Sequence, residues 1–196
     1  MIRAYFNQRA AIWDETVSEK DTAKLERVAK RLSINPGSTV LDVGTGTGVF
    51  TPFLLGEVGK DGRVVSLDFA EEMLREARAK EFKGNIDYIC AAVMEIPLID
   101  GMFDVVVCYS SFPHFQDKAL ALAEISRVLK GGGRVLICHT SSRAKINEIH
   151  CQIPVVATDI IPGEDAMQVM LAEAGFTGVE IDDNSESYLC SARKSG

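Results

Sequence analysis

An aspartate and three glycines at alternate positions are the residues of this chain best suited to binding a small charged ligand. Asp42 lies in the apolar run 40–43, and Gly44, Gly46 and Gly48 follow it. Glycine allows a sharp turn and lets a ligand approach the main chain without meeting a Cβ atom. The free amides at the start of a following helix favour a carboxylate or a phosphate. We therefore expect a buried strand, a binding loop and a helix in succession.

A second acid strengthens this interpretation, because glycine-rich turns also occur without any ligand. Asp68 closes the apolar run 63–67, about 20 residues after the glycines. An acid at this separation holds the ribose hydroxyls in the βαβ units that bind nucleotides. The two features together indicate a nucleoside-containing ligand.

The spacing of the glycines separates two classes of nucleotide site. A dinucleotide fingerprint, G-x-G-x-x-G, would require a glycine at position 49, where this chain has Val49. A Tyr-x-x-x-Lys pair, the second signature expected of a nucleotide-dependent oxidoreductase, is also missing. Such an oxidoreductase is therefore the weaker alternative. The order D-x-G-x-G-x-G resembles motif I of the class I S-adenosylmethionine-dependent methyltransferases. In that family the loop wraps the methionine end of the cofactor, and the resemblance implies that Asp42 faces its ammonium group.

A second stretch, 129–137, resembles the fifth-strand segment of the same family, and the resemblance extends over about 39–190. Alternating strands and helices favour a doubly wound α/β sheet with helices on both faces. The resemblance implies a Rossmann-like sheet of seven strands in the order 3-2-1-4-5-7-6, with the last strand antiparallel. We expect one domain over 1–196, in which 1–33 form a helical cap and 34–196 the Rossmann-like core.

Apolar periodicity and turn residues give the expected elements. Glycines 131–133 should lead into the fifth strand, and Pro52 should lie in the first turn of its helix. Helices are predicted over 4–14, 21–32, 49–58, 70–82, 119–129, 141–151 and 167–174, and strands over 40–43, 63–67, 86–90, 103–108, 134–139, 179–182 and 187–192.

The cofactor should lie over the carboxyl ends of the strands, where the strand order reverses. One departure from the family concerns the adenine end, where Ala92 stands in place of the usual acid. Adenine recognition would then depend on the main chain and apolar contacts near Ala92 and Val93, or on Glu95. Phe69 and Met73 are expected beside the ring, although both also fit a core position. The predicted cofactor-binding residues are Asp42, Gly44, Thr45, Gly46, Gly48, Asp68, Phe69, Met73, Ala92, Val93 and Tyr109.

The acceptor side is expected just beyond the fourth and fifth strands. A sulfonium is already a good leaving group, so methyl transfer needs mainly alignment and exclusion of water. His114 and His139 are candidates for a general base, with Tyr109 beside them. The alternatives are a hydrogen-bonded structural histidine, or a metal site that includes His150 and Cys151. Ser110 and Ser142 also follow these strands, and Tyr5 and Trp13 would either contact substrate or anchor the first helix.

Composition limits the partners. The net charge of -7 over 196 residues disfavours a nucleic acid, whose phosphates require Lys and Arg. No apolar stretch is long enough for a membrane span, and the first residues lack a signal-peptide core. The five cysteines include no C-x-x-C pair, which argues against a disulfide framework and against a structural zinc site. We expect a cytoplasmic S-adenosylmethionine-dependent methyltransferase that methylates a small molecule by in-line displacement, with no metal. The alternative is a non-catalytic protein that binds the same cofactor.

Overall fold

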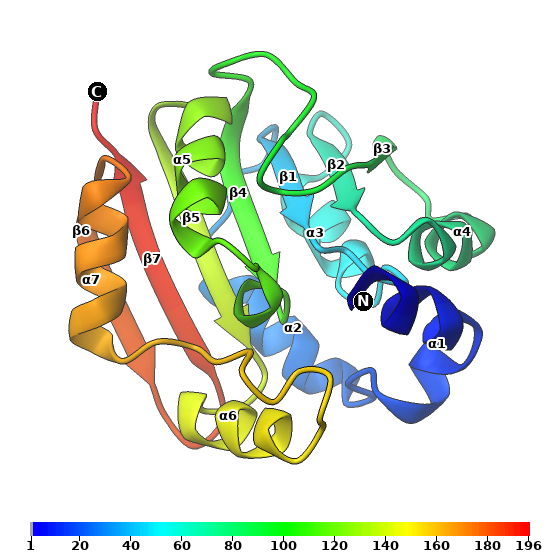
Figure 1. Ribbon diagram of the computed structural model, residues 1–196. Helices are drawn as coiled ribbons and strands as arrows, with labels where there is room; N and C mark the ends of the chain where they lie inside the picture. The colour runs from blue at the N-terminus through cyan, green and yellow to red at the C-terminus, as the bar shows by residue number, and fades with distance from the viewer. Residues whose placement is uncertain (1) are drawn as a thin grey trace.

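The computed structural model describes residues 2–196 and consists of a twisted sheet covered by helices (Figure 1). The helices are α1 (Ile2–Thr16), α2 (Thr22–Arg31), α3 (Thr51–Val58), α4 (Glu71–Ala79), the short 3₁₀ helix η1 (Phe112–His114), α5 (Lys118–Val128), α6 (Arg143–Cys151) and α7 (Glu164–Glu173). The strands are β1 (Thr39–Val43), β2 (Arg63–Asp68), β3 (Ile86–Cys90), β4 (Phe103–Tyr109), β5 (Leu129–His139), β6 (Phe176–Asp183) and β7 (Tyr188–Lys194).

The strand order is β3-β2-β1-β4-β5-β7-β6, as expected. Strands β1 to β5 pair in parallel, whereas β7 runs antiparallel to both β5 and β6. A parallel sheet brings the carboxyl ends of its strands to one edge, where ligands of open α/β sheets bind. The glycine loop after β1 and the segment after β4 therefore lie at the same edge.

The two faces of the sheet bury separate apolar clusters, because side chains alternate across a strand. On β4, Val106 belongs to the cluster that contains the apolar residues of α5 and α7, and Val107 to the cluster that contains those of α2 and α3. Both side chains have no exposed surface. A strand buried on both faces reads as a continuous apolar run, which explains why β4 was predictable from sequence.

Several boundaries differ from the sequence prediction, and two of these differences have a clear local cause. Glycines 131–133 lie inside β5 and do not precede it, and the register between β4 and β5 shifts between Phe103 and Val105 to accommodate them. Helix α4 ends at Ala79, because Glu81 has a left-handed φ of 49° that no α-helix continues through. Pro52 lies in the first turn of α3, as expected.

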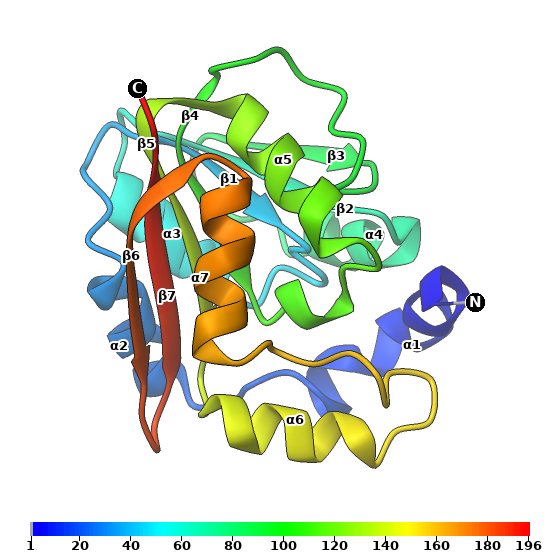
Figure 2. The same ribbon diagram turned by 60° about the vertical axis from the view of Figure 1, so that its left-hand side comes forward.

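Three segments gather at the carboxyl ends of the parallel strands. Figures 1 and 2 show α1, η1 and the connection between α6 and α7 around this edge of the sheet. Within residues 2–196, no helix combines the length and apolarity needed to cross a membrane.

Candidate active site

The glycine loop between β1 and α3 leaves one position open. All three glycines have left-handed φ angles, 72° at Gly44, 56° at Gly46 and 79° at Gly48. A Cβ atom on Gly44 would lie 2.4 Å from the Cβ of Ser111, and one on Gly48 would lie 2.7 Å from the Phe82 ring. A Cβ on Gly46 would meet no atom within 4 Å. The outer glycines thus permit close packing, while Gly46 faces free space in which a ligand can lie.

Asp42 lies beneath this loop. Its carboxyl is 2% exposed and accepts hydrogen bonds from the hydroxyls of Thr45 at 2.7 Å and Thr51 at 3.5 Å. Burial, with a further contribution from the charge of Asp68, raises the pKa of Asp42 to about 7. The carboxyl thus supports the loop through Thr45, and its contact with a ligand ammonium stays a prediction.

Asp68, at the end of β2, faces the glycine loop as expected. Its Oδ2 atom accepts a hydrogen bond of 2.8 Å from the Gly46 N–H, and Oδ1 accepts one of 2.8 Å from the Ala70 N–H. Burial raises the pKa of Asp68, and these hydrogen bonds and nearby His114 oppose that effect. Each carboxylate oxygen can accept a second hydrogen bond, so both remain able to bind a ligand hydroxyl.

An aromatic cluster joins α1 to the end of β2. The Phe6 ring meets Phe69 edge-on at 5.8 Å and Trp13 at 5.5 Å. Met73 is 2% exposed and packs in a small apolar cluster with Ala10. The core alternative therefore describes Met73 best, because α1 covers its side chain. Trp13 likewise anchors α1, whereas Phe69 remains partly exposed.

A polar contact closes the other end of α1 over the loop. Asp14 accepts a hydrogen bond of 2.5 Å from the hydroxyl of Thr47 and forms an ion pair with Lys80. The Lys80 ammonium also donates to the main-chain oxygen of Thr47 at 2.7 Å. Because Thr47 lies between Gly46 and Gly48, this contact fixes α1 directly against the candidate binding loop.

Arg9 is a candidate that the sequence interpretation missed. It shares one face of α1 with Ile2, Phe6 and Trp13, at the spacing of an inward helical stripe. The Nε atom is buried and has no hydrogen-bond partner within residues 2–196. The guanidinium carbon lies 5.2 Å from the centre of the Tyr5 ring. An arginine with an unsatisfied buried donor suits a carboxylate ligand, which guanidinium binds with paired hydrogen bonds.

The segment after β3 carries the expected adenine end. Val93 is buried and Ala92 partly so, whereas the Glu95 side chain is exposed. The Ala91 N–H donates to the main-chain oxygen of Asp68 at 3.0 Å, which joins this segment to the end of β2. The start of this segment thus lies directly beside Asp68.

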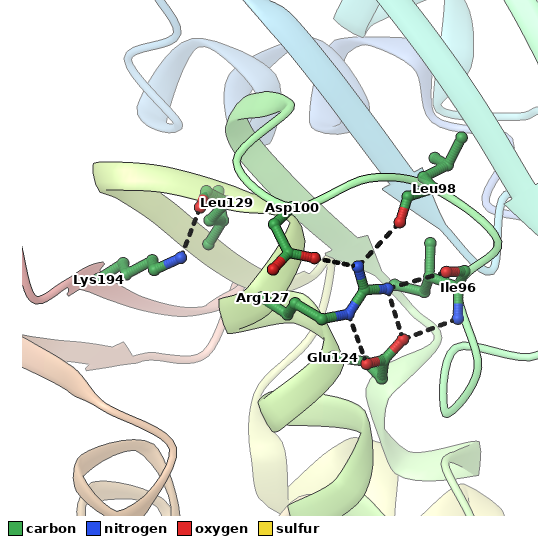
Figure 3. Close-up of polar contacts among 7 residues, drawn as sticks. All are labelled: Ile96, Leu98, Asp100, Glu124, Arg127, Leu129 and Lys194. Carbon is green, nitrogen blue, oxygen red and sulfur yellow. Dashed lines mark hydrogen bonds and ion pairs between the residues drawn. The ribbon is translucent and has the colours of Figure 1, made fainter.

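An arginine on α5 fixes the next part of this segment (Figure 3). Arg127 donates to the main-chain oxygens of Ile96 at 2.9 Å and Leu98 at 2.8 Å, and pairs with Asp100. Glu124 accepts from Arg127 and from the Ile96 N–H at 2.9 Å. The main chain after the adenine segment is therefore held at several points by two charged residues of one helix.

The end of β4 lies directly against the glycine loop. Ser111 donates to the main-chain oxygen of Val43 at 2.6 Å, and Ser110 has a left-handed φ of 51°. Tyr109 stacks on Phe50 with ring centres 4.3 Å apart, and its hydroxyl lies 3.4 Å from Thr140. Burial raises the pKa of Tyr109 to about 12, so the phenol stays protonated and serves as a hydrogen-bonding group only.

The two histidine candidates have different surroundings. The Nδ1 atom of His114 lies 2.8 Å from Oδ2 of Asp159, and its ring faces Phe6 at 5.4 Å. His139 is 1% exposed, neither ring nitrogen has a partner within residues 2–196, and burial lowers its pKa to about 3. His139 is therefore a buried neutral imidazole beside Tyr188, and the structure does not place it at an open surface.

The remaining acceptor candidates are explained by local structure. Ser142 caps α6 by accepting from the Lys145 N–H at 3.3 Å. In the part of the chain that the structure describes, no group of three or more His, Cys, Asp or Glu side chains has the geometry of a metal site. The metal alternative for His150 and Cys151 thus has no support from the coordinates.

Comparison with known proteins identifies the family. A family model described as a methyltransferase domain matches residues 41–137, which include the glycine loop, Asp68 and β4. A demethylmenaquinone methyltransferase from Staphylococcus aureus is 30% identical over 181 residues, which cover 80% of this chain and 75% of that protein. The chain belongs to the S-adenosylmethionine-dependent methyltransferases.

Two further comparisons support the assignment of this methyltransferase to the family. A demethylmenaquinone methyltransferase from Lactococcus lactis is 41% identical over 118 residues, which cover 59% of this chain and 47% of that protein. The chain spans about half the length of that relative. A crystal structure of a methyltransferase dependent on the same cofactor, from Aquifex aeolicus, has a TM-score of 0.75 at 26% identity and covers 91% of this chain and 95% of its own.

Proposed function

We propose that this methyltransferase moves the methyl group of S-adenosylmethionine to a small-molecule acceptor. The observation that carries the proposal is the free space over Gly46, bordered by the Asp68 carboxylate. The cofactor supplies an activated methyl group on a sulfonium. The protein then needs to align the acceptor and exclude water.

Each end of the cofactor has a matching group in this site. Asp68 would accept hydrogen bonds from the ribose hydroxyls, and the amides around Gly46 would meet the methionine end. The unsatisfied Nε of Arg9 would bind the methionine carboxylate. Phe69 would contact the nucleoside, and the apolar segment at Ala92 and Val93 would cover the adenine through main-chain and van der Waals contacts.

Residues 1–33 would serve as a cap over this site within one domain, 1–196. The ion pair of Asp14 with Lys80 and the contact of Phe6 with Phe69 support this role, because both join α1 to residues beside the cofactor position. A closed cap would exclude water from the sulfonium and prevent its loss by hydrolysis.

The acceptor is proposed to be a small molecule. Two relatives are named demethylmenaquinone methyltransferases, and the net charge of -7 disfavours nucleic acid. In-line displacement requires no fixed triad, so one fold serves many acceptors.

The direct test is turnover with a panel of small acceptors. The protein is incubated with methyl-labelled S-adenosylmethionine, and the formation of S-adenosylhomocysteine and of labelled product is measured. Gly46→Val is the inactive control, and Asp61→Asn, which alters an exposed turn residue, is the active control. Stoichiometric labelled product supports the proposal. Binding of cofactor with no product from any acceptor favours the non-catalytic alternative.

A further inference from the structure

A cavity lies between η1 and the connection from α6 to α7. Figures 1 and 2 show these two segments at the edge of the sheet where the parallel strands end. The cavity volume of about 360 Å³ is in the range of small-molecule sites. Three apolar and five polar or ionisable residues line it, namely Ile2, Phe115, Val155, His114, Gln116, Lys118, Thr158 and Asp159.

Two contacts join this cavity to the proposed cofactor position. Phe6 lies between the two sites, with its ring 5.4 Å from His114 and 5.8 Å from Phe69. Three residues before His114, Ser111 packs against Gly44 and bonds to the main chain of β1. The cavity is therefore connected to the glycine loop through Ser111 and to the end of β2 through Phe6.

His114 has a defined tautomer in this setting. Asp159 accepts a hydrogen bond at 2.8 Å from Nδ1, so in the neutral imidazole Nδ1 carries the proton and Nε2 carries the lone pair. No hydrogen-bond partner occupies Nε2 among residues 2–196. The two side chains are 17% and 23% exposed, so the pair is partly shielded from water. This arrangement is that of an imidazole base oriented by a carboxylate.

The neighbouring groups hold the pair in place. The ring of His150 lies 4.8 Å from that of His114, and its Nδ1 bonds to the main-chain oxygen of Asp159. Lys118 donates to the main-chain oxygens of Pro113 at 2.9 Å and Phe115 at 3.1 Å, which leaves its third N–H for a ligand.

Asp68 also faces His114, as do the imidazoles of His139 and His150. Burial lowers the pKa of Lys118, and Asp159 opposes that effect. The imidazole thus has carboxylates on two sides.

We propose that this cavity binds the methyl acceptor, a small molecule with an ionisable O–H or N–H, that His114 is its general base, and that Asp159 is the positioning residue. The inference rests on the proposed function. The His114 Nε2 takes the proton from the acceptor, and the acceptor's electron pair forms a bond to the methyl carbon. The bond from that carbon to sulfur breaks with its electrons on sulfur, and the proton leaves His114 for solvent.

The test uses 4-nitrophenol as a chromogenic probe of proton transfer. Its phenolate absorbs visible light, so the protonation state of bound probe is read directly, without turnover. The probe is titrated into the complex with S-adenosylhomocysteine, at a pH below the phenol's own pKa. Wild-type protein is expected to convert bound probe to phenolate, in saturable amounts.

Variants separate the roles of the two residues. His114→Gln should abolish the phenolate signal, and Asp159→Asn should reduce it about tenfold, because a neutral amide makes a weaker hydrogen bond to the ring than a carboxylate does and orients it less firmly. Asp61→Asn, which changes an exposed turn residue, should keep the signal. Thermal unfolding and calorimetric titration with S-adenosylhomocysteine confirm that each variant is folded and binds cofactor product.

Opposite outcomes are equally specific. Absence of probe binding, or a phenolate signal that persists in His114→Gln, would overturn the inference. If a variant does not fold, the histidine ring protons of the wild-type protein are observed by NMR instead. Addition of the probe should then shift the His114 signals, and unchanged signals would overturn the inference. Failure of S-adenosylhomocysteine to bind wild-type protein would instead count against the proposed function itself.

Discussion

The carboxylate of Asp68 accepts a hydrogen bond of 2.8 Å from the main-chain N–H of Gly46, 22 positions earlier in the chain. The bond connects the end of β2 to the middle of the loop after β1. The group proposed to hold the ribose and the loop proposed to hold the methionine end are thus one connected unit. A change at either residue should therefore alter cofactor binding more than it alters the fold.

Gly46→Val should abolish binding of S-adenosylhomocysteine and lower the melting temperature only moderately. The new side chain would occupy the free space above the loop. A valine held at the left-handed φ of 56° that Gly46 adopts also adds backbone strain of about 1–2 kcal/mol. Gly101→Val is the matched control, because Gly101 also has a left-handed φ, 64°, and open space at its Cβ position. Calorimetric titration should find normal affinity in the control. Equal loss in both variants would contradict the loop assignment.

Arg9→Met should weaken the binding of S-adenosylhomocysteine about tenfold or more and leave the free energy of unfolding nearly unchanged. Binding should weaken because a hydrogen bond between charged groups contributes about 1.5–3 kcal/mol. Stability should change little because the buried Nε has no hydrogen-bond partner within residues 2–196 in the free protein. Arg78→Met is a suitable control, since Arg78 also stacks on a tyrosine ring, at 5.3 Å from Tyr88, but belongs to α4. Unchanged affinity in Arg9→Met would remove this residue from the site.

Asp42→Asn should make the protein more stable at neutral and higher pH. The pKa of Asp42 is raised from 3.8 to about 7 in the fold, so its contribution to stability is full below about pH 4 and is lost as the pH rises through 7. The loss is on the order of 4 kcal/mol, and Asn can still accept the Thr45 hydrogen bond.

Urea unfolding at about pH 5 and about pH 8 measures this effect. The wild-type protein should lose stability between the two, whereas Asp42→Asn should show a much flatter dependence. The exposed Asp61→Asn serves as the control for general charge effects. An identical pH dependence in wild type and Asp42→Asn would show that Asp42 is ionised in the fold at little cost.

Arg127→Lys should destabilise the fold by about 1–2 kcal/mol and speed hydrogen exchange at the amide of Ile96. A lysine has a single nitrogen and cannot bridge the two main-chain oxygens and two carboxylates that Arg127 contacts. Arg75→Lys is the comparison, because Arg75 forms only an exposed pair with Glu72 and should change stability by less than about 0.5 kcal/mol. Equal effects would mean that the Arg127 contacts add nothing beyond a surface pair.

The elements with strong local signals were predictable from sequence. Strand β3 has the predicted bounds, and β1 and β2 agree to within one residue, because each is a short, mainly apolar run with turn residues at both ends. The strand order followed from the resemblance to the methyltransferase family and is confirmed. The position of Asp68 beside the glycine loop followed from the rule that ligands bind at the carboxyl ends of strands.

The contacts that define the acceptor side depend on residues far apart in the chain. His114 and Asp159 are 45 positions apart, and Asp14 and Thr47 are 33 apart, so no periodicity links them. The burial of His139 also had no local signal, because its environment is made by β7 and the neighbouring helices. Arg9 had a usable signal in the stripe that it forms with Ile2, Phe6 and Trp13.

Thermal unfolding with S-adenosylhomocysteine and with NAD, measured in parallel on wild type and Asp68→Ala, tests the central claim most directly. At about 100 times its dissociation constant, a ligand of the native state stabilises it by about 2.7 kcal/mol. We predict that S-adenosylhomocysteine stabilises the wild type, that Asp68→Ala needs a much higher concentration for the same shift, and that NAD has no effect. Stabilisation by NAD alone, or an unchanged response in Asp68→Ala, would contradict the account.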